Sequence, residues 1–181
     1  MSIEVERLEG LEAWIACERL EAEVRGAPTP QPACSVPTLQ AVHESGGLIL
    51  GAWETLGSQR SLQGVSVDLD GSHAGFAALV SLFFGVVPER RNAGVATALR
   101  LAERASAVER GAEVIRWWID PLRGEEAHLA LHKLGAVGTR YNRNLFGDLP
   151  DRCNGGRATD RVGVEWWVRA PRTAAAGASG R

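Results

Sequence analysis

The stretch SLFFGVVPERRNAGVATALRLAERASAVER, residues 81–110, carries signals for a strand, a turn and a helix in succession. Residues 82–87 form a short apolar run with aromatic and β-branched side chains, which predicts a buried strand that ends at Pro88. From Val95 onward, apolar residues recur at helical spacing, and this spacing puts Arg100 and Glu103 on other faces of the predicted helix. The stretch therefore predicts a strand–turn–helix unit.

The turn in this unit has the features of an anion site. A helix N-terminus carries free N–H groups and the positive end of the helix dipole, and Gly94 lets the backbone come close to a bulky anion. Arg90 and Arg91 add mobile positive charge beside it. No Gly-Lys-Ser/Thr follows, and only one of the three glycines of the dinucleotide fingerprint is present. Residues 91–96 therefore predict a phosphate or pyrophosphate cradle of another type.

The pattern R-x-x-G-x-A after a strand that ends V-x-P resembles the coenzyme A loop of the GNAT acyltransferase superfamily, whose signature is Q/R-x-x-G-x-G/A. Arg91, Gly94 and Ala96 match the signature positions one by one. The resemblance covers residues 74–146, including a second strand predicted at residues 114–120 and a helix that ends K-L-G-A. The alternative is an ordinary strand–turn–helix with a glycine in its turn. The resemblance implies a mixed α/β (α+β) fold, with a central, mostly antiparallel twisted sheet, splayed central strands and helices on both faces.

Three longer blocks, RWWIDPL, HKLGA and DRVGVEWW, resemble a branch of the superfamily that is linked with N-acylamino-acid racemases. Some members of that branch are N-succinyltransferases that act on amino acids. The resemblance thus implies an acyl-CoA-dependent N-acyltransferase that transfers an acetyl or succinyl group to the amine of a small metabolite, with an amino acid as the favoured acceptor. Two alternatives stay open: a catalytically impaired acyl-CoA-binding sensor or partner protein, and a peptide N-acetyltransferase.

The coenzyme-binding residues also follow from the resemblance. Acetyl-CoA or another acyl-CoA is the expected cosubstrate, and no metal is expected. In this fold the end of the strand before the loop leaves backbone groups free for the pantetheine arm, and the loop holds the pyrophosphate. The expected coenzyme-binding residues are Phe84, Gly85, Val86, Val87, Arg91, Asn92, Ala93, Gly94, Val95 and Ala96.

The general acid is less clear, because the chain departs from the family pattern. Leu131 occupies the position of the tyrosine that usually protonates the leaving thiolate. His132, next to it, and His128 lie on the same short predicted helix, and an imidazole can serve in either proton role. Tyr141, the one tyrosine of the chain, is a further donor candidate. The alternative for the histidines is that they simply face solvent.

Two carboxylates are candidates for the general base. Asp120 ends the strand next to the coenzyme strand, and Glu165 lies beside a tryptophan on a late strand. Asp120 has the competing role of capping the following turn, and Glu165 has that of pairing with an arginine such as Arg116. Many family members use water alone.

Composition limits the remaining function classes. With 181 residues the chain is long enough for one domain, which we place at residues 1–171 and follow with a disordered tail at residues 172–181. The net charge of −2 argues against nucleic-acid and membrane partners. Three cysteines without a C-x-x-C pair indicate reduced thiols, and residues 1–10 lack the apolar core of a signal peptide, so we expect a cytoplasmic protein.

The segments outside the motif complete the expected architecture. Residues 11–25 predict a helix, and the four prolines within residues 27–37 predict a loop. In the family this segment commonly borders the acceptor site; the alternative is a plain surface connection. Residues 47–53 and 62–69 predict consecutive antiparallel strands. The tryptophan pairs 117–118 and 166–167 leave an apolar acceptor pocket or a homodimer contact open.

Overall fold

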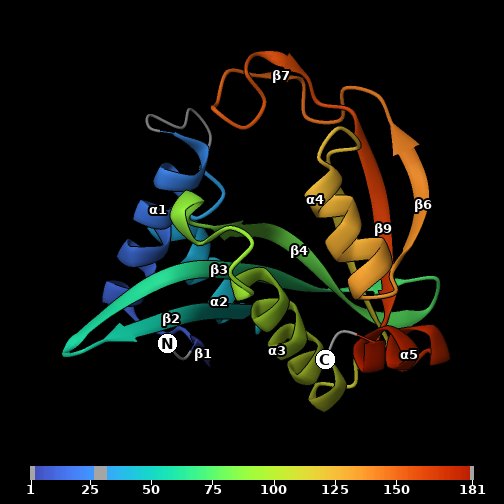
Figure 1. Cartoon of the computed structure of the whole chain (residues 1–181), viewed down its shortest axis with the longest axis horizontal. Coiled ribbons are helices and arrows are strands. Elements are labelled where there is room, and N and C mark those ends of the chain that lie inside the picture. Colours follow the sequence, from blue (N-terminus) through green and yellow to red (C-terminus); the bar gives the residue numbers. More distant parts are fainter. Residues whose placement is uncertain (1–2, 27–31, 180–181) are drawn as a thin grey trace. The chain divides into compact units, whose positions relative to one another are not determined.

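A computed structural model describes residues 3–26 and 32–179 of the chain (Figure 1). Its strands form a seven-stranded sheet in the order β1-β2-β3-β4-β5-β9-β6 and a two-stranded sheet of β7 and β8. Four pairs of neighbouring strands are antiparallel: β1–β2, β2–β3, β5–β9 and β6–β9. The pair β4–β5 is parallel. The prediction of a mixed, mostly antiparallel sheet is therefore confirmed. The chain divides into two compact units, which we describe separately.

Unit 1 comprises residues 1–70, 81–105 and 151–153. It contains β1 (Ile3–Arg7), α1 (Leu11–Arg25), α2 (Val36–Glu44) and β2 (Leu48–Leu56). It also holds most of β3 (Gln59–His73), the second half of β4 (Phe76–Val86) and most of α3 (Val95–Glu109). β1, β2 and β3 pair as the antiparallel meander that the sequence predicts.

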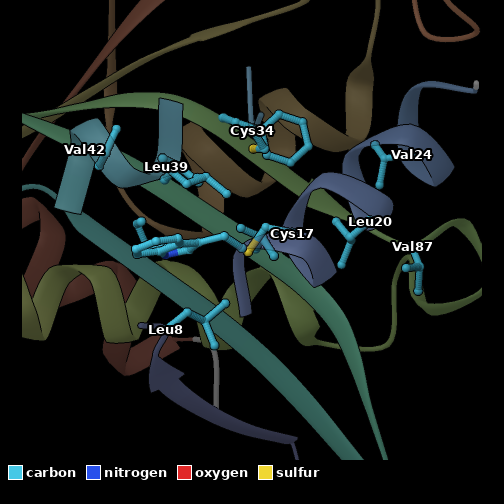
Figure 2. Packing of buried hydrophobic residues seen from close by; sticks show 13 residues of the cluster. Leu8, Cys17, Leu20, Val24, Cys34, Leu39, Val42 and Val87 are labelled. Carbon is cyan, nitrogen blue, oxygen red and sulfur yellow. The ribbon is translucent and has the colours of Figure 1, made fainter. Parts of the chain in front are cut away.

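The core of unit 1 lies between α1, α2 and one face of its strands (Figure 2). Side chains at alternate positions of β2 and β3 point into it, because successive strand residues face opposite sides. The cluster consists of Leu8, Trp14, Cys17, Leu20, Val24, Cys34, Leu39, Val42, Ile49, Val65, Val67, Phe83 and Val87. The opposite face of β3 meets α3, since a Cβ on Gly64 would lie 2.8 Å from Leu99 Cδ1. Helices therefore cover both faces of the sheet in this unit.

Unit 2 comprises residues 71–80, 106–150 and 154–181. After the first half of β4 it contains β5 (Val114–Ile119), α4 (Gly124–Ala127) with a π-helical turn (His128–Lys133), and β6 (Val137–Asn142). The short strands β7 (Asp148–Leu149) and β8 (Arg157–Ala158), then β9 (Arg161–Trp167) and α5 (Pro171–Ser179) complete it. β9 pairs with both β5 and β6, and Trp117 packs edge-on against Trp166 on the buried side of this ladder.

Several element boundaries differ from the sequence expectation. Pro37 belongs to α2. Proline is tolerated in the first helical turn, because a backbone N–H there would have no intrahelical acceptor and its absence costs no hydrogen bond. Residues 171–179 form α5, whose Thr173 hydroxyl donates to the Trp167 carbonyl at 2.8 Å, whereas the sequence favours a disordered tail there. Of the proline-rich loop, residues 27–31 lie outside the described residues. Within the described chain, no helix is long and apolar enough to cross a bilayer.

The buried side of α3 is the main correction to the sequence analysis. The spacing argument put Arg100 and Glu103 on other faces of the helix, and this is wrong: Arg100 is 3% exposed and Glu103 is 0% exposed. They lie on the buried side with Val95, Leu99 and Ala107. Apolar periodicity misses such positions, because it counts a charged residue as evidence of a solvent-facing site.

Candidate functional site

The coenzyme loop of the sequence analysis forms a tight connection between β4 and α3. A 3₁₀ turn (Pro88–Arg90) follows the strand, and the Ala93 N–H then donates to the Arg90 carbonyl at 3.3 Å. Asn92 and Gly94 adopt left-handed backbone conformations with φ of +62° and +88°. The loop therefore reverses direction within a few residues and delivers the chain to the start of α3.

The start of α3 presents unused backbone donors. The first intrahelical bond runs from Ala98 N to Gly94 O at 3.0 Å, so the N–H groups of Val95, Ala96 and Thr97 have no intrahelical acceptor. Residues 91–94 are exposed, and a Cβ on Gly94 would meet no atom within 4 Å. The geometry thus fits an anion that approaches the backbone closely, as a pyrophosphate does.

The two arginines of the loop are not equivalent. Arg90 donates from Nε and Nη2 to Glu54 Oε2 at 2.9 and 2.7 Å, and Glu54 is 6% exposed. Our expectation that Arg90 supplies mobile charge is therefore wrong: it anchors the loop to β2. Arg91 is exposed, and its guanidinium forms no ion pair with any described residue. Arg91 is thus the side chain that remains free to meet an anion.

The end of β4 has the backbone geometry expected of a pantetheine strand. Its ladder with β5 covers residues 78–80 only, so in the described structure residues 81–86 do not pair with β5. The Val87 N–H donates to the Gln63 carbonyl of β3 at 2.9 Å. Because the N–H and C=O groups of neighbouring strand residues point to opposite sides, Phe84 and Val86 direct theirs away from β3. These two residues, more than Val87, have groups available to a ligand.

Gly85 is required by packing. A Cβ at this position would lie 2.7 Å from Phe83 Cζ and 3.4 Å from Val24 Cγ2. The side chains of α1 and β4 therefore fill the space that a larger residue would need, and the backbone of Gly85 lies close to both.

Asp120 and Glu165, the base candidates, both have structural partners. Asp120 Oδ1 accepts the Leu122 N–H at 2.9 Å, which is the turn-capping alternative considered above. Glu165 Oε1 lies 2.9 Å from His73 Nε2 and 3.9 Å from Arg116 Nε. The pairing of Glu165 with Arg116 is an expectation from the sequence, whereas His73 is distant in sequence and becomes a neighbour only through the sheet.

Tyr141 and His132, the acid candidates, lie at the surface. The Tyr141 hydroxyl donates to Asp160, and this hydrogen bond is the main cause that raises the pKa of the tyrosine. The ring of His132 stacks on that of His128, with centroids 4.9 Å apart. Leu131, next to His132, is half-buried. All four catalytic candidates belong to unit 2, and the loop belongs to unit 1. Within unit 2 the four side chains contact different residues and do not form one hydrogen-bonded group among the described residues.

Two further features were missed by the sequence analysis. One is the set of buried polar side chains under α3, formed by Ser66, Asp68, Arg100 and Glu103. The sequence contains a signal for these buried side chains: Asp68 follows the apolar run of a strand, and the oppositely charged Arg100 and Glu103 are three positions apart on one helix. The other is His73. No group of three or more His, Cys, Asp or Glu side chains that could hold a metal ion occurs among the described residues.

No protein-family model and no curated protein matches the chain. Solved structures match it over most of its length. A chain of the NatC complex bound to Gag peptide and CoA aligns with a TM-score of 0.73 at 13% identity, over 91% of this chain and 98% of that one. Arabidopsis thaliana NAA60 in complex with acetyl-CoA aligns with a TM-score of 0.71 at 13% identity, over 92% and 99%.

A structure from Desulfovibrio desulfuricans that is assigned to the GNAT family of acetyltransferases aligns with a TM-score of 0.67 at 13% identity, over 92% of this chain and 99% of that one. Identities this low establish the fold. The chain therefore has the fold of the GNAT acetyltransferases, with the loop of residues 91–96 following β4 and opening α3.

Proposed function

We propose that the protein is an acyl-CoA-dependent N-acyltransferase that acts on the amine of a small metabolite, with an amino acid as the favoured acceptor. The observation that carries the proposal is the start of α3, where unused N–H groups, an open Gly94 and the free Arg91 occur together on a GNAT fold. A diphosphate needs this combination of fixed donors and positive charge. The acetyl-CoA and CoA complexes among the similar structures support an acyl-CoA as the cosubstrate.

The residues divide the binding of the coenzyme between them. Arg91 and the N–H groups at the start of α3 hold the pyrophosphate, and Arg90 keeps the loop in place through Glu54. The backbone groups of Phe84 and Val86 hydrogen-bond the pantetheine arm. This fixes the thioester in one orientation, which lowers the entropic cost of the reaction.

In the reaction, the neutral amine attacks the thioester carbonyl and forms a C–N bond. The tetrahedral intermediate then collapses, the C–S bond breaks, and the products are an amide and coenzyme A. One proton leaves the amine and one proton reaches the thiolate. We keep Asp120 and Glu165 as candidates for the first transfer, and His132 and Tyr141 as candidates for the second.

The identities proposed for the acyl group and the acceptor rest on the resemblance to the branch linked with N-acylamino-acid racemases. A succinyl donor has a distal carboxylate, for which Arg116, Arg140 and Arg143 are the available cations. A peptide N-terminus is the other acceptor class, since a Gag peptide is bound in the NatC structure.

A second candidate function is acyl-CoA binding without turnover. It is favoured by Leu131, an apolar side chain at the position where the family has its proton-donating tyrosine. The hydroxyl of Tyr141, the one tyrosine of the chain, is engaged in a hydrogen bond to Asp160.

Thiol release separates these functions. The purified protein is incubated with acetyl-CoA or succinyl-CoA and with panels of amino acids and of short peptides, and free coenzyme A is measured. We expect release that depends on an amino acid. Release with peptides alone would move the acceptor to the peptide class. Binding without release from any donor and acceptor would support the second function.

A further inference from the structure

A group of polar side chains is buried within unit 1, under α3. Ser66 and Asp68 of β3 and Glu103 of α3 are 0% exposed, and Arg100 of α3 is 3% exposed. Charged side chains are almost never buried to this extent unless they are paired. We call this group, Ser66, Asp68, Arg100 and Glu103, the α3 polar cluster.

Arg100 and Glu103 account for each other's charge. Arg100 Nη1 donates to both carboxylate oxygens of Glu103, at 3.0 and 2.7 Å. Two acidic side chains and one basic side chain are present, so the cluster would carry a net negative charge if both carboxyls were ionised. A second buried negative charge would be costly.

The oxygens of Asp68 indicate how this cost is avoided. Oδ2 accepts the Ser66 hydroxyl at 3.1 Å, whereas Oδ1 is buried and accepts from no donor among the described residues. The side chains of Asp68 and Glu103 are within hydrogen-bonding reach of each other. Two ionised carboxylates cannot hydrogen-bond, but a proton on one of them turns it into a donor. A single shared proton therefore satisfies the unpartnered oxygen and makes the cluster neutral.

The electrostatics agree with this arrangement. Burial raises the pKa of Asp68 well above its usual value, and the charge of Glu103 raises it further, while Arg100 and the Ser66 hydroxyl act in the opposite direction. These are the groups that face the Asp68 carboxyl from α3 and from its own strand.

The cluster also contacts the strand that we propose binds the pantetheine arm. The Arg100 guanidinium carbon lies 3.9 Å from the centroid of the Phe84 ring, which is close for a cation–π contact. Leu99, the neighbour of Arg100, packs against Gly64, and a Cβ on Gly64 would lie 3.0 Å from the Gly85 carbonyl oxygen. The orientation of the Arg100 guanidinium therefore affects the position of the Phe84 ring.

We propose that Asp68 and Glu103 share one proton, and that this singly charged pair holds the Arg100 guanidinium against Phe84 and thereby positions the coenzyme-binding end of β4. Arg100 is a positioning residue in this account. The shared proton does not depend on the proposed function, whereas the effect on the coenzyme rests on it.

The proton is tested by infrared difference spectroscopy at pH 7 on protein whose Asp and Glu carboxyls are labelled with ¹³C. We expect a C=O band of a protonated carboxyl in the wild type, lost in both Asp68→Asn and Glu103→Gln. The control is Asp70→Asn, an exposed residue two positions further along β3, which should keep the band. No band in the wild type, or a band that survives in Asp68→Asn, would overturn the shared proton.

The positioning is tested by acetyl-CoA affinity. The double variant Arg100→Met/Glu103→Gln keeps the cluster neutral and removes the guanidinium, and we expect roughly tenfold weaker binding, the order of a desolvated cation–π contact. Phe84→Leu leaves the polar cluster intact and should weaken binding to a similar degree, which keeps the test valid if the double variant fails to fold. Affinity equal to wild type in Phe84→Leu or in a folded double variant would overturn the positioning. A wild type that binds no acyl-CoA would instead refute the proposed function and leave the infrared result standing.

Discussion

Gly94→Glu tests whether the start of α3 holds the pyrophosphate. The substitution adds a carboxylate where a Cβ meets no atom within 4 Å, so the side chain has room and the fold has no steric reason to fail. The backbone at this position has φ of +88°, which costs an L-residue about 1–2 kcal/mol. For a chain of this size that corresponds to a fall of the melting temperature by several degrees.

The electrostatic effect acts on coenzyme binding, whereas the backbone strain acts on the stability of the fold. Two unit charges 4 Å apart in water interact by about 1 kcal/mol, so a carboxylate beside the two charges of a pyrophosphate costs about 2 kcal/mol. That is roughly a 30-fold loss of acetyl-CoA affinity. The loss should shrink as salt is added, because both groups are exposed to solvent.

Gly94→Gln is the matched control, since it has the same backbone strain and nearly the same shape without the charge. Isothermal titration with acetyl-CoA at two salt concentrations measures both variants against the wild type. The reasoning requires Gly94→Glu to bind more weakly than Gly94→Gln at low salt. Equal affinity of the two variants and the wild type would refute it.

Two further predictions concern unit 2 and the core of unit 1. Tyr141→Phe removes the hydrogen bond that is the main cause of the lowered pKa of Asp160. A carboxyl whose pKa is lowered in the folded protein stabilises the fold at pH values above its unfolded pKa, so we expect the melting temperatures of wild type and variant to differ at pH 7 and to converge as the pH falls below about 4. A difference that stays constant with pH would contradict this. Burial raises the pKa of the Cys17 thiol to about 12 and that of the Cys34 thiol still further. A thiol reagent at pH 8 should therefore leave these two of the three cysteines unlabelled until the protein is unfolded. Rapid labelling of all three cysteines in the native protein would contradict this.

Local patterns in the sequence were sufficient to predict several elements, including the helix that follows the loop. The helix Leu11–Arg25, the start of α3 at Val95 and the strand Val114–Ile119 were predicted within a residue of their observed bounds. Each has a clear period and a clear stop signal, such as Gly26 after α1. The mixed sheet followed from the resemblance of the loop and its neighbouring segments.

What could not be predicted depends on contacts between residues that are distant in sequence. The Arg90–Glu54 pair joins the loop to β2 and the His73–Glu165 pair joins β3 to β9, and neither partner carries a local signal of the other. The surroundings of the buried Glu103 likewise include a residue that is distant in sequence, Asp68 of β3. Periodicity alone treats such residues as solvated.

The most direct test of the central claim is calorimetric titration of the purified protein with coenzyme A, acetyl-CoA and succinyl-CoA. The account predicts saturable one-to-one binding that weakens when Arg91 is replaced by Gln, since this is the free cation of the loop. A preference between the two acyl donors would identify the acyl group. The absence of binding to all three ligands would contradict the account, and the chain would then share only its fold with the acetyltransferases.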